Sequence, residues 1–396
     1  MLVTRRFLLV MLVTLLFFTY VGLQIPLLPR LIEEQLGGNE FHIGLNIAAF
    51  SIAAVAIRPW LGRWSDRYGL RRIMIGGALA ASSAAALVPL AGNLWLLMPL
   101  RALAGAGEGA VFVGAATMIS DLAPAHRRAE ATSYLSLAVF GGIGLGPILS
   151  EAVIHDGNFD RGFWLASIFT LAAAGCALLL PGGPPVHPEG HRPDTSDLPR
   201  FHRAALRPGA VLALGMGGFA TFNAFVPDHA QAVGLHGSKY VFLVYSVVCL
   251  IVRLVGARLP DRIGLARSGS IALCSLAAGL TLMSAWATPA GLFAGTAVLA
   301  VGMSFLYPAL STIAVNAVPA HERSRVVSTF TMFFEIGTAC GGLLFGAVAE
   351  LSGKRGGFLG GAVSAIVGLW VLWRVLLPWE RARPISASDL TAVPAH

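Results

Sequence analysis

Long apolar segments alternate with short polar ones along the whole chain. Each apolar segment is rich in Leu, Val, Ala, Phe and Gly and contains few charges. About 20 helical residues are enough to cross about 30 Å of hydrocarbon. The pattern predicts transmembrane helices at 7–29, 41–62, 73–91, 94–118, 129–151 and 161–181, and again at 208–228, 239–259, 268–287, 291–317, 326–350 and 356–378.

One polar segment is longer than the others and divides the chain. Residues 182–207 are rich in Pro, Gly, His and charge, which is typical of a solvated linker. We therefore expect an N-terminal six-helix bundle at 1–181, a cytoplasmic linker at 182–207, a C-terminal six-helix bundle at 208–380 and a cytoplasmic tail at 381–396. The expected fold class is all-α, a polytopic membrane protein with twelve transmembrane helices in two pseudo-symmetric bundles.

The two halves repeat each other at an offset of 195 residues. The offset superimposes charged loop residues: Arg58 on Arg253, Asp66 on Asp261, Arg67 on Arg262 and His126 on His321. The matched loops follow the second and fourth helix of each half, so the repeat is parallel and its axis lies along the membrane normal. Such a duplication places a substrate site between two bundles that rock against each other.

Composition agrees with a membrane protein. Hydrophobic residues make up 56% of the 396 residues and charged residues only 12%, against about a quarter in soluble domains. The net charge of +8 is scattered in short clusters, so it does not indicate nucleic-acid binding. The four cysteines have neither metal-ligand nor redox spacing, and no P-loop or catalytic triad is present. We expect no metal, no cofactor, no ATP-driven step and no enzyme.

The basic residues also predict orientation. If the N-terminus is cytoplasmic, most Lys and Arg residues between the helices fall on the cytoplasmic side, where positive charge is retained during insertion. The residues left for the other side are Arg30, Arg161, Lys239, Lys354 and Arg355. We therefore expect a multi-pass protein of the cytoplasmic (inner) membrane, with both termini in the cytoplasm. We further expect a monomer whose partners include membrane lipids.

The loop after the second helix carries a charged motif. It reads Gly62-Arg63-Trp64-Ser65-Asp66-Arg67-Tyr68-Gly69-Leu70-Arg71-Arg72, and a degenerate copy follows at Asp261-Arg262-Ile263-Gly264. The motif resembles the signature loop of the major facilitator superfamily, and the likeness extends over essentially the whole chain. The resemblance implies transport by alternating access. It also implies a cytoplasmic gate formed by Gly62, Asp66, Arg67, Gly69, Arg71, Arg72, Asp261 and Arg262. The alternative is that these arginines only set topology.

The fourth helix contains two ionisable residues, Arg101 and Glu108. Seven residues separate them, so they lie on one stripe about 10 Å apart along the helix axis. Ionisable groups within membrane helices face the bundle interior and mark ion or proton pathways. We predict that Glu108 carries a proton beside Arg101; the alternative is that Glu108 only ties helices together by pairing with an arginine.

Other polar residues are candidates for the substrate cavity. Gln24 lies on the first helix, where many drug exporters of the resembled family carry an acidic residue. Asn223 and Tyr307 lie within the seventh and tenth helices. Asp228 and His229 lie near the end of the seventh helix, and we expect them to face water.

The fifth helix contains the run Gly141-Gly142-Ile143-Gly144-Leu145-Gly146-Pro147. It resembles the Gly-Pro motif of the superfamily's drug:proton antiporters, and other segments resemble bacterial arabinose-efflux-like or multidrug permeases. We expect Gly142 and Gly146 to pack tightly against the opposite half and Pro147 to bend the helix.

The resemblance implies export of small amphipathic or cationic molecules by proton antiport. The motif is incomplete, because Leu149 and Ser150 stand where a glycine pair often follows. Proton-coupled uptake of a sugar or similar solute therefore stays open. So does a non-pumping protein that translocates lipid or acts as a receptor.

A buried ion pair between the halves is also predicted. Glu335 lies about ten residues into its helix, about 14 Å deep, and Arg58 lies eight residues before Asp66, about 12 Å deep, at 1.5 Å per residue. The two helices meet between the halves in the resembled fold. A charge buried alone at that depth is strongly unfavourable. The repeat matches Arg58 to Arg253 but Glu335 to Phe140, so only one side of the interface carries the pair.

Overall fold

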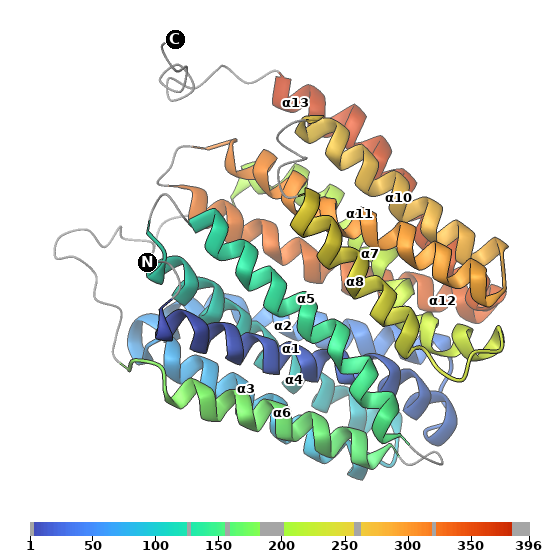
Figure 1. The fold of residues 1–396 in the computed structure, drawn as a ribbon, viewed down its shortest axis with the longest axis horizontal. Coiled ribbons are helices and arrows are strands. Elements are labelled where there is room, and N and C mark those ends of the chain that lie inside the picture. Colours follow the sequence, from blue (N-terminus) through green and yellow to red (C-terminus); the bar gives the residue numbers. More distant parts are fainter. Residues whose placement is uncertain are drawn as a thin grey trace.

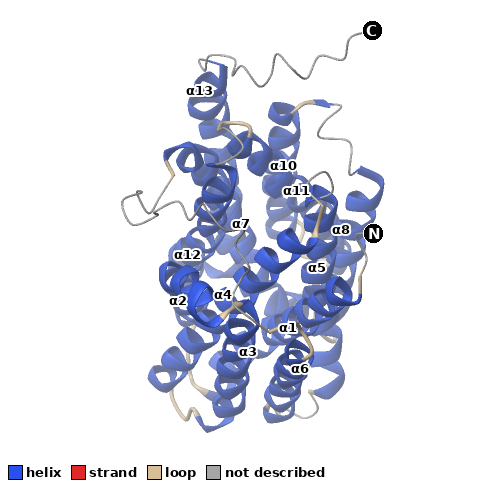
Figure 2. Cartoon of the chain, turned by 90° about the vertical axis from the view of Figure 1, so that its left-hand side faces the viewer, coloured by secondary structure: helices blue, strands red, loops and turns tan. Residues whose placement is uncertain are grey.

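In the computed structural model, the described residues are 4–124, 128–154, 159–182, 202–256, 263–318 and 322–381, and they form helices and no strands. Figures 1 and 2 show a bundle of long helices that run side by side. The helices of the N-terminal half are α1 (Arg5–Arg30), α2 (Glu40–Tyr68), α3 (Leu70–Leu87), α4 (Leu94–Leu122), α5 (Arg128–Val153) and α6 (Asp160–Leu178). Those of the C-terminal half are α7 (Arg203–Ala232), α8 (Lys239–Gly256), α10 (Leu265–Ala285), α11 (Pro289–Val315), α12 (Arg323–Val371) and α13 (Leu377–Arg381).

Each of the twelve predicted helices has a counterpart among the described residues. Ten candidate membrane spans are long and apolar enough to cross a bilayer. The last of them, Val326–Glu380, has 55 residues and is too long for one crossing. It contains Gly353, whose φ of 76° and ψ of 170° interrupt the helix, so α12 holds the last two predicted helices. The remaining prediction, at 239–259, corresponds to α8.

Polar residues fix where several helices begin. The side chains of Thr4, Asn39, Asn93 and Thr288 each accept a hydrogen bond from a backbone N–H of the first helical turn. That N–H has no partner within its own helix, so the cap stabilises the helix terminus. Asn93 and Thr288 are 195 residues apart, so the repeat preserves the cap of α4 in α11.

The repeat is also visible in the backbone. Gly69 and Gly264 begin α3 and α10 with φ of 82° and 87° and nearly the same ψ, 150° and 149°. Residues with a side chain rarely adopt this conformation, whereas glycine does so at little cost. The glycine of the signature loop is therefore required by a turn that both halves make.

The most extensive contacts between the halves join two pairs of helices. α2 packs on α12, and α5 packs on α8; Figure 2 shows α2 beside α12. Within the N-terminal half, α1 packs on α5 and α6, and α3 packs on α4 and α6. The two interfacial pairs are equivalent under the repeat, since α8 and α12 are the counterparts of α2 and α5.

The glycines of the fifth helix do not all face the opposite half. A side chain at Gly142 would collide with the backbone of α1 near Thr19, and one at Gly146 with the backbone at Gly22. Both glycines thus allow α1 and α5 to approach each other within the N-terminal half, so the expected packing against the opposite half is wrong for them. The cross-half contact comes from Gly144, which lies against Ser246 of α8.

Glycines also set the approach of α2 to α12. A β-carbon at Gly44 would overlap the backbone at Gly342, and one at Gly346 would lie 3.2 Å from the Cα of Gly44. The two helices are therefore in backbone contact near the end of the bundle opposite the signature loop.

We expect Gly44→Val to force α2 away from α12 and to destabilise the protein by about 1–3 kcal/mol, which is usual for an overpacked interface. The measurement is the apparent melting temperature in detergent. Gly175→Val is the matched control, because a side chain at Gly175 meets nothing within 4 Å. Equal melting temperatures for the two variants would contradict the tight contact.

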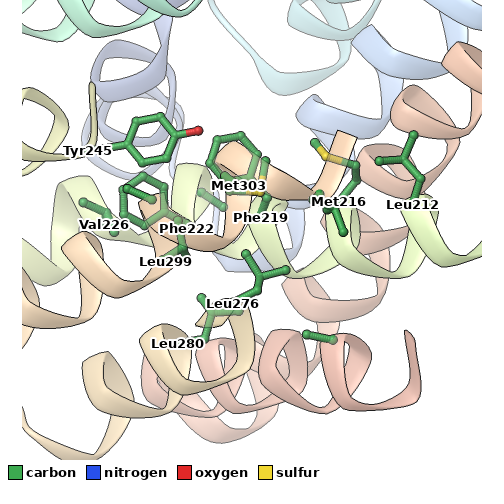
Figure 3. Close-up of a cluster of buried hydrophobic side chains, with 14 of the residues drawn as sticks. Leu212, Met216, Phe219, Phe222, Val226, Tyr245, Leu276, Leu280, Leu299 and Met303 are labelled. Carbon is green, nitrogen blue, oxygen red and sulfur yellow. The ribbon is translucent and has the colours of Figure 1, made fainter. Parts of the chain in front are cut away.

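At some positions that the repeat makes equivalent, the C-terminal half carries buried apolar side chains where the N-terminal half carries polar ones. Figure 3 shows Phe219, Phe222 and Tyr245 together with Met303. The Phe219 and Tyr245 rings stack with centroids 5.5 Å apart. By the offset of 195 residues, Phe219 is the counterpart of Gln24, and Met303 is the counterpart of Glu108.

Candidate functional site

Arg101 lies buried between α4, α1 and α2. Its Nη1 donates to Gln24 Oε1, and its Nε donates to Asn46 Oδ1 at 3.0 Å. Its guanidinium lies over the Phe50 ring, 4.5 Å from the centroid. We call Gln24, Asn46, Phe50 and Arg101 the Arg101 cluster. Two amide oxygens and an aromatic face satisfy the guanidinium without neutralising its charge.

Tyr20 connects the Arg101 cluster to Glu108. Its buried side chain interacts electrostatically with both Arg101 and Glu108. Glu108 itself is only 5% exposed, and within the described residues its Oε2 has no hydrogen-bond partner. The stripe predicted on α4 therefore faces the bundle interior, and Tyr20 of α1 is within electrostatic range of both of its charges.

A second carboxylate approaches Glu108 from the opposite half. Glu335 of α12 is 6% exposed and interacts electrostatically with Glu108 and with Arg58 of α2. Arg58 also interacts with Glu108, and its Nη1 donates to Thr331 Oγ1 at 2.8 Å, one turn before Glu335. Arg58 is thus held against α12 one turn before Glu335, within electrostatic range of both buried carboxylates. The predicted pairing of Arg58 with Glu335 stays a prediction.

The repeat-related arginine has different neighbours. Arg253 of α8 lies over the ring of Phe140, 4.2 Å from the centroid, at the position that matches Glu335. It also interacts with Tyr245 and with Tyr307, and Tyr307 interacts with Arg58 as well. Tyr307 is therefore within electrostatic range of both equivalent arginines. One arginine faces carboxylates and the other faces aromatic rings.

A set of ion pairs joins the halves at the end opposite the signature loop. Lys354 Nζ lies 3.2 Å from Glu33 Oε1 and 3.5 Å from Asp228 Oδ2. Glu33 belongs to a π-helical turn that follows α1, whereas Asp228 and Lys354 belong to the C-terminal half. We call these three residues the Lys354 cluster. The expectation that Asp228 and His229 face water is wrong: the Asp228 side chain is 10% exposed and His229 is 4% exposed.

A second link lies at the same end. Glu151 Oε1 accepts from Ser238 Oγ at 2.8 Å and lies 3.9 Å from Arg30 Nη2. With the Gln231 amide oxygen turned toward Arg30, that oxygen accepts from Arg30 Nε at 3.0 Å. Arg30 and Glu151 belong to the N-terminal half, and Gln231 and Ser238 belong to the C-terminal half. The halves are therefore tied together at this end by side chains as well as by the α2–α12 glycines.

We expect Lys354→Ala to loosen this end of the bundle, because it leaves two partly buried carboxylates without their shared cation. The readout is maleimide labelling of a cysteine placed at Ala230, which is buried on α7, in a chain whose four native cysteines are replaced by serine. Labelling should become faster in the Lys354→Ala background. Lys354→Arg keeps the charge and serves as the control. Unchanged labelling in both backgrounds would show that the cluster does not hold this end closed.

The predicted gate residues are partly outside the described structure. Asp261 and Arg262 lie outside the described residues, and the surroundings of Gly62 and Asp66 within α2 are not described. Arg67 lies over the ring of its neighbour Tyr68, 5.3 Å from the centroid. Arg71 lies against Gly182, and Arg72 is exposed. The gate stays a prediction.

Other polar atoms in the interior have no partner among the described residues. They include Asn46 Nδ2 on α2, Asn223 Oδ1 on α7 and Ser150 Oγ on α5. Buried polar groups are nearly always hydrogen-bonded to protein, water or ligand. These atoms are therefore available to bind a polar ligand or water within the bundle.

Sequence reasoning did not assign a role to several of these residues. Tyr20, Phe50 and Thr331 gave no signal as single positions in apolar segments. Glu33 and Glu151 stand near helix ends, where a carboxylate is common. Their roles depend on contacts between helices far apart in sequence.

Comparison with known proteins identifies the family. A sequence model of the Major Facilitator Superfamily matches residues 10–276 and 210–395. An uncharacterised MFS-type transporter of Salmonella typhimurium is 27% identical over 372 residues, covering 91% of this chain and 94% of that protein. One of Pseudomonas aeruginosa is 29% identical over 382 residues, covering 93% and 92%.

Solved structures share the fold. The nucleoside transporter NupG superposes with a TM-score of 0.75 at 14% identity, covering 96% of this chain and all of that one. A bacterial homologue of the human lysosomal transporter Spinster, in an inward-facing and unoccupied conformation, gives 0.76 at 14% identity and covers 97% of this chain. At such low sequence identity, the similarity shows a shared fold and does not extend to function. The family match spans nearly the whole sequence and the twelve-helix fold agrees with it, so this chain is a transporter, not an enzyme, and belongs to the Major Facilitator Superfamily.

Proposed function

We propose that this transporter exports small amphipathic molecules in exchange for protons by alternating access, from an inner membrane in which both termini are cytoplasmic. The observation that carries the proposal is that Glu108 of α4 and Glu335 of α12 are both buried within electrostatic range of Arg58, which donates a hydrogen bond to Thr331 one turn before Glu335. Carboxyl groups buried within membrane helices are typical of proton pathways.

The position of Arg58 supports a link between proton binding and movement. An ionised Glu335 attracts Arg58 and so favours contact between α2 and α12, whereas a protonated Glu335 does not. A proton therefore changes the free-energy difference between two arrangements of the halves, which is what coupling requires.

The contrast between the halves supports an amphipathic substrate. The Arg101 cluster and Glu108 make the N-terminal half polar, while Phe219 and Met303 occupy the matching positions in the C-terminal half. A molecule that lies between them meets polar groups on one side and aromatic and aliphatic groups on the other. The Gly-Pro motif at Gly146-Pro147 supports antiport through its likeness to drug exporters.

The test uses purified protein in liposomes. Counterflow of labelled candidate compounds first identifies a transported molecule. A pH gradient that is acidic inside should then drive that molecule into the vesicles, because protons leave as it enters. Movement out of the vesicles under the same gradient would overturn antiport.

One observation favours a second candidate, proton-coupled symport of an organic anion. Arg58, Arg101 and Arg253 lie within the bundle, and among the described residues Arg253 faces aromatic groups and no carboxylate. An anionic substrate would balance that charge and favour proton binding at Glu108 and Glu335. The gradient experiment separates this candidate from export, because symport moves the molecule in the opposite direction.

A further inference from the structure

A groove on the N-terminal half plays no part in the chemistry above. It lies between α2 and α3 over α4 and has a volume of about 330 Å³. Its walls include Ile57, Leu61 and Trp64 of α2, and its floor consists of glycine and alanine residues of α3 and α4. Arg72 is the charged residue in its lining. We call it the α2–α3 groove.

The groove runs along the helices from the signature loop into the membrane. From Arg72 to Ala80 is eight residues of α3, about 12 Å at 1.5 Å per residue. The loop end carries Trp64 and Tyr68, which are 42% and 44% exposed. Aromatic and basic residues are typical of the membrane–water interface, and apolar residues of the depth below it. The groove therefore has a charged end at headgroup level and an apolar interior at acyl-chain level.

Its surroundings indicate that it opens toward lipid. Leu79 of α3 and Leu103 of α4 are large apolar side chains that are 44% and 40% exposed. In a membrane-spanning bundle such side chains face hydrocarbon. A side chain at Gly76, which lines the groove, would meet nothing within 4 Å.

We propose that the α2–α3 groove binds one acyl chain of an anionic phospholipid, with the lipid phosphate held by Arg72. Arginine forms strong, charge-assisted hydrogen bonds with phosphate. Arg63 and Arg67 are exposed in the last two turns of α2 and add positive charge at this level. Basic residues at the membrane surface attract anionic lipids.

The repeat makes the site specific to one half. Arg72 corresponds to Arg267, so the basic residue is retained at the start of α10. Gly76 corresponds to Ile271, and Ala106 of the groove floor corresponds to Val301. The C-terminal half thus carries larger side chains where the groove needs small ones. A lipid in the groove would pack against α2, the helix that also packs on α12 of the opposite half.

The experiment measures binding of phosphatidylglycerol with brominated acyl chains, which quench nearby tryptophan fluorescence. The protein is held in phosphatidylcholine nanodiscs, and the Trp64 signal is the difference between the native chain and Trp64→Phe. We expect quenching of Trp64 by phosphatidylglycerol at lower lipid fractions than by brominated phosphatidylcholine. Arg72→Gln should raise the fraction needed by about tenfold, the effect of losing one or two charge-assisted hydrogen bonds.

One variant tests whether the groove itself is needed, and a second serves as a control. Gly76→Ile places in the groove the residue that the other half carries, and it should abolish the preference for phosphatidylglycerol. Arg267→Gln is the matched control and should leave it unchanged. Melting temperatures in phosphatidylcholine check folding; if Gly76→Ile does not fold, Gly76→Val is used in its place.

Three results would overturn the proposal. The first is equal quenching by the two lipids in the native chain. The second is an Arg72→Gln chain that binds like the native one. The third is full competition by glycerol phosphate, which has no acyl chain, together with an unaffected Gly76→Ile variant, because the site would then bind a free phosphate group and not a lipid.

Discussion

Glu108→Gln is expected to abolish proton-driven transport while substrate exchange continues. Glutamine keeps the shape of the side chain and one oxygen acceptor but cannot carry a proton through the cycle. Glu108 is buried on α4, next to Tyr20 and within electrostatic reach of Arg58 and Glu335. The measurement compares accumulation under an imposed pH gradient with counterflow in its absence, in the same liposomes.

The control for this prediction is a carboxylate outside the interior. Glu350 is exposed on α12, so Glu350→Gln should retain both activities. If Glu108→Gln still accumulates substrate against a gradient, Glu108 does not carry the coupled proton, and Glu335→Gln becomes the decisive variant. Loss of counterflow as well would assign Glu108 to the binding of substrate instead of coupling.

The sequence predicted the helices and the repeat well because both depend on local or regular patterns. Membrane helices need only length and hydropathy, and the glycine turns at Gly69 and Gly264 need only one residue type. The N-caps at Asn93 and Thr288, which we did not predict, are local features of the same kind. Such features are set by the nearest neighbours along the chain.

The site was predicted less completely because its contacts join distant helices. Spacing placed Arg101 and Glu108 on one face of α4, but it could not reveal that Gln24, Asn46 and Phe50 surround the guanidinium. A small residue indicates that another helix packs closely at that position, but it does not identify that helix. For that reason Gly142 and Gly146 were expected against the opposite half, although they contact α1.

The polar residues near the helix ends were ambiguous for a related reason. Lys354 and Arg30 indicate topology in a sequence, and their charge alone does not reveal a partner. In the structure Lys354 pairs with Glu33 of the opposite half and with Asp228 of its own half, whereas Arg30 pairs with Glu151 within the N-terminal half. Whether a charged side chain near a helix end faces water or pairs with another residue depends on which other segments of the chain pack against that end.

The last prediction concerns Arg58 and Glu335. Arg58→Ala and Glu335→Ala should each lower the stability, by up to about 3–5 kcal/mol, because each leaves an opposite charge buried without its partner. The double variant should lose less than the sum of the two, with a coupling energy between about 0.5 and 3 kcal/mol. Thr331→Val, measured separately, accounts for the hydrogen bond that Arg58 also donates.

The repeat supplies the matched control, since Arg253 faces Phe140 in the equivalent place. A cation–π contact of this kind is worth about 0.5–2 kcal/mol, so the cycle of Arg253→Ala and Phe140→Ala should give the smaller coupling. Additive losses for Arg58 and Glu335 would refute the pair and leave Glu335 free to carry a proton of its own.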